Sequence, residues 1–341
     1  MERLRSHPVL MTVLAFALAI AAVAAVAIIN GFSAFRHAWS DVHVGWLALV
    51  VGGELLAIPA YAGLYRKVAE LEGGPDTPFP LVLRLVIAGF GPFAPDGGFA
   101  LDKRALHALE EDEHSATVRV LGLGALEWAL LAPAAWVAAV VLLATDDPRP
   151  MPSLLWPWAI AVPIGFVIAL WLAVPERTER IAEGDGGWRK PLGKALHGVG
   201  VLRTLAGDLV RSWLAWAGTA LYWALDIAAF YGAVRFIGLR PDLGETILAY
   251  ATGYALTRRS MPLGGAAVTE LLMTFALHWV GQPIAPALAA VVVYRVFNFV
   301  LPAGPALLVR RRLRPLLEAV EEGRSPTRHE QRRASAPLGQ G

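Results

Sequence analysis

The sequence contains no cysteine. This absence excludes disulfide bonds, thiolate metal sites and cysteine nucleophiles. The sequence also lacks common enzyme signatures, namely the nucleophile elbow G-x-S-x-G, the Walker A loop, the zinc motif H-E-x-x-H and the dinucleotide-binding fingerprint. We therefore expect a protein that is not an enzyme, holds no cofactor or metal ion, and does not pump by hydrolysing ATP on its own.

Charged residues are scarce, at 17% of the chain, whereas 56% of the residues are hydrophobic. This balance is typical of an all-α polytopic membrane protein. Apolar stretches long enough to cross a bilayer, which takes about 20 residues, run over residues 9–29, 44–65, 118–144, 154–174, 208–237 and 284–309. These six stretches are the predicted transmembrane helices.

Two further apolar regions, residues 81–100 and 246–280, each contain one copy of the pattern Pro-x-Gly-Gly. The copies occupy residues 95–98 and 262–265, 167 positions apart. Proline removes a helical hydrogen bond and glycine loosens the backbone, so each copy predicts a broken helix. Free backbone groups at membrane depth need shelter from protein or water. We therefore predict two broken, re-entrant elements beside the six spans.

Basic residues are distributed unevenly among the predicted loops. With a cytoplasmic N-terminus, the external loops keep only Arg36, Arg149 and Arg240. The positive-inside rule favours this orientation, provided that the element at 81–100 enters and leaves on the cytoplasmic side. The element at 246–280 can be re-entrant or form two full spans. We expect a multi-pass plasma-membrane protein with both termini in the cytoplasm.

A shift of 167 residues superposes the span 44–65 on 211–232, and the span 118–144 on 285–311. Under the predicted topology, the units 44–144 and 211–309 are inverted repeats. Such repeats are common in secondary transporters, whose substrate site lies where the broken helices meet. The alternative is a chance recurrence of a short glycine-rich pattern. The predicted domains are a transmembrane domain at 1–309 and a basic, partly disordered cytoplasmic tail at 310–341.

Ionisable residues inside spans are costly and are therefore functional candidates. Arg295 has the strongest case, because it lies mid-span with no helix end nearby. Its anion is either Glu127, which the repeat shift places one residue from the equivalent position, or a substrate phosphate with Glu127 as the resting partner. Glu270 follows the second break and can pair with Arg258 or Arg259. The structural alternative for each residue is a buried ion pair that joins helices.

Two other intramembrane acids, Glu54 and Asp226, can relay protons or hydrogen-bond to neighbouring helices, and the second interpretation is favoured. Half-helices that begin at the two glycine pairs would point their positive ends into the protein centre, where they favour a phosphate or a carboxylate. Alternatively, the glycines only allow close helix packing. The candidate substrate-binding residues are Gly97, Gly98, Glu127, Arg258, Arg259, Pro262, Gly264, Gly265, Glu270, Tyr294 and Arg295.

The stretches GFGPFAPDGGFALDKRAL, LEWALL, RSMPLGGAAVTELL and AAVVVYRVFNFVLP resemble the lysylphosphatidylglycerol synthase transmembrane region, a flippase-like membrane family. The likeness covers residues 44–309. The family's Pro-Gly-Gly-x-x-x-x-Glu motif is matched by Pro262, Gly264, Gly265 and Glu270, and its Tyr-Arg pair by Tyr294 and Arg295. The first motif is only partly kept. Because the chain ends about 30 residues after its last span, we expect it to lack the cytosolic synthase domain.

The resemblance implies a protein that moves a phospholipid or a lipid-linked anionic headgroup between leaflets. One alternative is a lipid-binding subunit or scaffold without transport, which would serve a lipid- or glycan-modifying enzyme. Another is a secondary transporter of a small anion. The expected partner is therefore a membrane phospholipid or a lipid-linked substrate, and no nucleic acid is expected.

Overall fold

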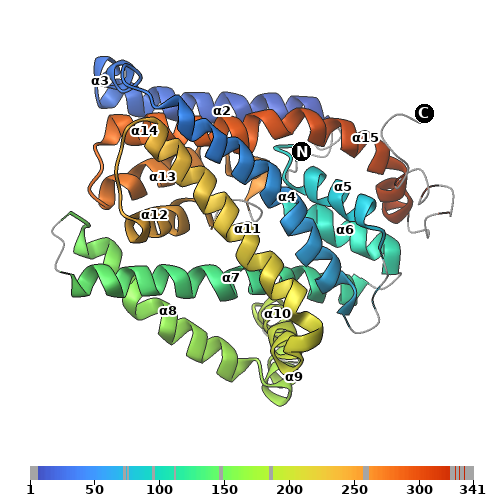
Figure 1. The fold of residues 1–341 in the computed structure, drawn as a ribbon. Coiled ribbons are helices and arrows are strands. Elements are labelled where there is room, and N and C mark those ends of the chain that lie inside the picture. The colour runs from blue at the N-terminus through green and yellow to red at the C-terminus, as the bar shows by residue number, and fades with distance from the viewer. Residues whose placement is uncertain are drawn as a thin grey trace.

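The structure is a computed structural model that describes residues 7–71, 74, 77–93, 97–110, 113–145, 149–183, 187–255, 261–322, 327, 330 and 334. Within these ranges the regular structure is helical and contains no strand. Figure 1 shows long helices that run side by side across the molecule. The all-α polytopic membrane fold predicted from the sequence is confirmed.

Five helices of the described ranges are long and apolar enough to cross a membrane. They are α2 (Pro8–Ile29), α4 (Leu47–Ala69), α7 (Glu113–Ala144), α8 (Pro152–Leu172), and the joined pair α14 (Ile284–Arg295) and α15 (Leu301–Glu321). The sixth predicted span is α11 (Leu209–Phe236), which is 28 residues long. It is less apolar than the others because tryptophan, tyrosine and Asp226 interrupt its hydrophobic run.

Helices α4 and α11 form the centre of the fold. They pack along their lengths in opposite directions (Figure 1). A Cβ atom added at Gly53 of α4 would lie 2.6 Å from the carbonyl oxygen of Leu225, and one added at Gly218 of α11 would lie 3.2 Å from Leu64 Cβ. Small residues therefore set the close spacing of this pair, as is common between membrane helices.

The first broken element consists of α5 (Phe79–Gly89) and α6 (Gly98–Glu110). With 11 and 13 residues, neither helix can cross a bilayer. The chain enters the element after α4 and leaves it into α7, and these two points lie together. Arg119, near the start of α7, donates a hydrogen bond to the Leu71 carbonyl, just after α4, at 2.8 Å. The element is re-entrant, as predicted.

The second broken element begins with α12 (Leu243–Tyr250) and the π-helical segment Ala251–Ala255. It continues with the 3₁₀ turn Pro262–Gly265 and α13 (Val268–Trp279). Its outer ends lie beside the same short loop. Arg149 Nη2 lies 2.8 Å from Asp242 Oδ2, and Met151 N donates to the Trp279 carbonyl at 2.7 Å. With 8 and 12 residues, α12 and α13 are too short to cross a bilayer, so the element is re-entrant and does not form two spans.

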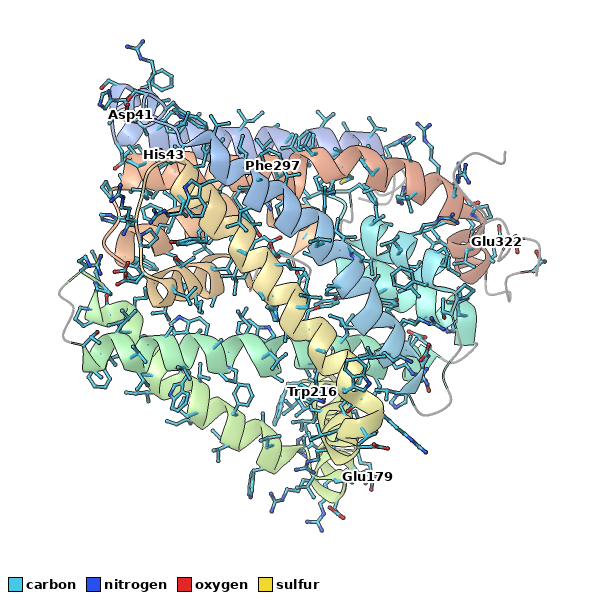
Figure 2. All side chains as sticks on the ribbon, viewed as in Figure 1. Asp41, His43, Glu179, Trp216, Phe297 and Glu322 are labelled. Atoms are coloured by element: carbon cyan, nitrogen blue, oxygen red, sulfur yellow. The ribbon has the colours of Figure 1, made fainter. Side chains whose placement is uncertain are left out.

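The two re-entrant elements lie at opposite ends of the molecule, with α12 and α13 at one end and α5 and α6 at the other (Figure 1). Figure 2 shows Asp41 and His43 at the first end and Glu322 at the second. The remaining α-helices of the described residues are α3 (Phe32–His37), α9 (Pro175–Ala182) and α10 (Arg189–Gly207). Residues 310–321, at the start of the predicted tail, belong to α15.

Candidate functional site

Arg295 and Glu270 form an ion pair inside the protein. Arg295 is the last residue of α14, and Glu270 lies in the first turn of α13. The Nε atom of the arginine lies 2.7 Å from Glu270 Oε1, and the residues are 5% and 2% exposed. The Phe299 ring lies against the guanidinium, with its centroid 4.0 Å from Cζ. A charge pair this deep in a predicted span is a functional candidate.

The backbone beside this pair has an unusual conformation. Leu263, Gly264 and Ala267 have φ angles of 55°, 62° and 69°. The left-handed region is unfavourable for leucine and alanine, and such strain is concentrated at functional sites. Arg295 Nη2 donates to the Gly264 carbonyl at 3.4 Å. The strained turn therefore borders the ion pair directly.

The two broken elements meet at Gly264. A Cβ atom added there would lie 2.9 Å from Phe299 Cε2 and 3.8 Å from Pro92 Cα. Pro92 belongs to the connection between α5 and α6, so the first break reaches the second at this point. The ion pair thus lies where the re-entrant elements from the two ends of the molecule come into contact.

Asn298 extends the site towards α4. Its Nδ2 atom donates to Glu54 Oε1 at 2.9 Å. Its Oδ1 atom accepts from the Tyr254 hydroxyl at 2.5 Å and from Arg295 Nη1 at 3.5 Å. The 3.4 and 3.5 Å bonds of the two Nη atoms are long, so both remain weakly engaged by the protein.

Asp226 of α11 lies at the far side of this network. Its two carboxylate oxygens accept from the hydroxyls of Tyr250 at 2.8 Å and Tyr294 at 2.6 Å. All three residues are fully buried. Asp226 and Glu54 therefore hydrogen-bond to neighbouring helices, which is the interpretation that the sequence favoured for them. Tyr294, a candidate substrate-binding residue, donates its hydroxyl hydrogen bond to Asp226.

The predicted pairing of Glu127 with Arg295 is wrong. Glu127 lies on α7, where its Oε1 atom accepts from the Tyr61 hydroxyl and its backbone carbonyl accepts from Trp223 Nε1 at 2.9 Å. The 167-residue shift relates the long spans of the two repeat units, but it does not predict where α13 lies between them. That path brings Glu270, rather than Glu127, to the guanidinium.

The other predicted residues divide between the two breaks. Arg258 and Arg259 lie outside the described residues, and Glu270 pairs with Arg295. Gly98 begins α6, as expected, after Gly97 with a φ of 83°. The second half-helix begins later than predicted, at Val268, because residues 262–265 form a separate 3₁₀ turn.

Sequence reasoning did not select Asn298, Tyr250 and Tyr254 for the site. Asn298 carried a usable signal, because it follows Arg295 by three residues and so shares its helix face. An amide inside a span also needs a partner from another helix. The tyrosines carried no such signal, since tyrosine is common in membrane proteins.

Comparison with known proteins identifies the family of the chain. A family model for the lysylphosphatidylglycerol synthase TM region matches residues 107–306, more than half of the chain. None of the curated proteins compared with the chain matches it. The matched region runs from α6 to α15 and includes the ion pair, the second re-entrant element and Asp226. The chain belongs to the lysylphosphatidylglycerol synthase TM region family.

Proposed function

We propose that the protein binds the phosphate of a phospholipid or lipid-linked headgroup at Arg295 and moves that headgroup between the leaflets of the plasma membrane. The observation that carries this proposal is the buried Arg295–Glu270 pair at the contact between the two re-entrant elements. Transporters built from inverted repeats hold their substrate at such a contact. We further propose that residues 44–144 and 211–309 are the two inverted repeat units of this transporter.

Arginine suits this role for a chemical reason. Its planar guanidinium donates two parallel hydrogen bonds to a phosphate, and such charge-assisted bonds are stronger than neutral ones. In the structure, Nε is engaged by Glu270, whereas the two Nη atoms make only the long bonds to Asn298 and Gly264. A phosphate can therefore bind the Nη edge while Nε keeps its carboxylate partner.

The test is leaflet exchange of fluorescent phospholipids in vesicles that contain the purified protein. We expect exchange above that of empty vesicles, a strong loss in Arg295→Ala, and partial retention in Arg295→Lys, which keeps the charge but not the fork. Arg211→Ala is the matched control, because the Arg211 side chain is 90% exposed.

Two results would contradict the transport of lipid headgroups between leaflets. Exchange equal to that of empty vesicles, with retained binding of labelled lipid, would indicate a lipid-binding subunit or scaffold. Uptake of a soluble anion without lipid exchange would indicate a small-anion transporter. Exchange that Arg295→Ala leaves unchanged would remove Arg295 from the mechanism.

A further inference from the structure

Glu270 has one carboxylate oxygen that the protein leaves unused. Oε1 binds Arg295, but within the part of the chain that the structure describes Oε2 is buried and has no hydrogen-bond partner. Glu270 as a whole is 2% exposed. A buried acceptor without a donor is unfavourable, and such groups are rare in folded proteins. The oxygen therefore points to a donor that arrives with a ligand.

The neighbouring arginine has the complementary property. Its Nη1 and Nη2 atoms make only the 3.5 and 3.4 Å bonds to Asn298 and Gly264. The site thus offers weakly engaged donors and an unused acceptor on two residues that are in direct contact. A ligand that fits both must carry an anionic oxygen and a hydrogen-bond donor close to each other.

The charge of the pair narrows the ligand class further. Arg295 and Glu270 together carry no net charge. A singly anionic headgroup that binds the guanidinium leaves the carboxylate without full compensation in a buried environment, which is costly. A headgroup with both a phosphate and an ammonium compensates both residues and adds no net charge to the site.

We propose that the site selects zwitterionic phospholipids that carry a primary ammonium, with the phosphate on the Nη edge of Arg295 and the ammonium on Glu270 Oε2. The inference rests on the proposed function, because it names the substrate class of the same site. Phosphatidylethanolamine has this chemistry. Phosphatidylglycerol has a phosphate and hydroxyl groups but no compensating positive charge.

The experiment compares two acyl-labelled lipids, phosphatidylethanolamine and phosphatidylglycerol, in vesicles with the wild-type protein. We expect phosphatidylethanolamine to exchange at least about tenfold faster. Equal rates, or faster exchange of phosphatidylglycerol, would overturn the selectivity while leaving transport intact. Exchange of neither lipid would instead contradict the proposed function, so the two failures are distinct.

A charge-removing variant tests the role of the carboxylate. Glu270→Gln leaves Arg295 with an uncompensated positive charge, so we expect the preference to shift towards phosphatidylglycerol. Glu318→Gln is the control, since Glu318 lies in an exposed pair with Arg314 on α15. If Glu270→Gln does not fold, Glu270→Asp keeps the charge and should keep the preference at a lower rate. An unchanged preference in folded Glu270→Gln, or a lost preference in Glu270→Asp, would refute the assignment.

Discussion

The Tyr254 hydroxyl donates a hydrogen bond to Asn298 Oδ1 at 2.5 Å and thereby joins two π-helical segments. One segment is Ala251–Ala255 in the second re-entrant element, and the other is Val296–Val300 between α14 and α15. π-Helical turns are rare and occur often at functional sites. Here they bring a tyrosine and an asparagine from different elements to the side of Arg295.

Tyr254→Phe should destabilise the protein because it removes this donor and leaves Asn298 Oδ1 with only the long bond from Arg295. The expected loss is about 1–3 kcal/mol, the typical cost of a buried polar group that loses its partner. Thermal unfolding in detergent measures it. The control is Tyr231→Phe on α11, whose side chain is partly exposed. Equal melting temperatures for the two variants would contradict the prediction.

Asp226→Ala should have a larger effect. The substitution removes the acceptor of two buried hydroxyls, those of Tyr250 and Tyr294. Each orphaned hydroxyl costs about 1–3 kcal/mol, so we expect a marked fall in melting temperature and in the yield of folded protein. Asp41→Ala, at an exposed position, should change neither quantity. A melting temperature close to that of the wild type would show that Asp226 is dispensable for stability.

The adjacent glycines Gly52 and Gly53 on α4 should respond differently to alanine. A Cβ atom at Gly53 meets the Leu225 carbonyl oxygen at 2.6 Å and Ala229 Cβ at 2.9 Å, whereas one at Gly52 meets nothing within 4 Å. Gly53→Ala should cost about 1–3 kcal/mol through overpacking. Gly52→Ala should be neutral or stabilising, since alanine favours a helix. Thermal unfolding checks both, and equal effects would contradict the close spacing of α4 and α11.

The absence of cysteine makes the orientation straightforward to test. Asp41→Cys and Glu179→Cys each place a single thiol at an exposed position outside the candidate spans. The positive-inside rule predicts that a membrane-impermeant maleimide labels residue 41 in intact cells and residue 179 only after lysis. The opposite pattern would invert the proposed topology.

Hydropathy and helix-breaking residues were sufficient to predict the long helices and the two breaks. Apolar length decides where a helix can cross, and a proline followed by a glycine pair disfavours a continuous helix. Both properties depend only on neighbouring residues, so they can be predicted from a single sequence. The same reasoning placed Arg295 inside the protein, because it lies within a long apolar stretch.

The partners in the site could not be predicted in this way. Glu270 and Glu127 are both intramembrane acids, and only the path of α13 after the strained turn selects Glu270 for Arg295. Ala267 adopts a φ of 69° immediately before α13, a conformation that its residue type does not indicate. Contacts between distant elements, such as Asn298 with Glu54, likewise depend on the assembled bundle.

The contact between Pro92 and Gly264 has an electrical consequence. Each re-entrant element enters from a different end of the molecule, and they meet at this point beside Arg295. A headgroup that passes Arg295 would therefore cross the layer over which the membrane voltage acts. That voltage does work of about 2.3 kcal/mol on each elementary charge per 100 mV. Passage of a net-neutral headgroup would be independent of voltage, whereas passage of a singly charged one would be driven or opposed by it.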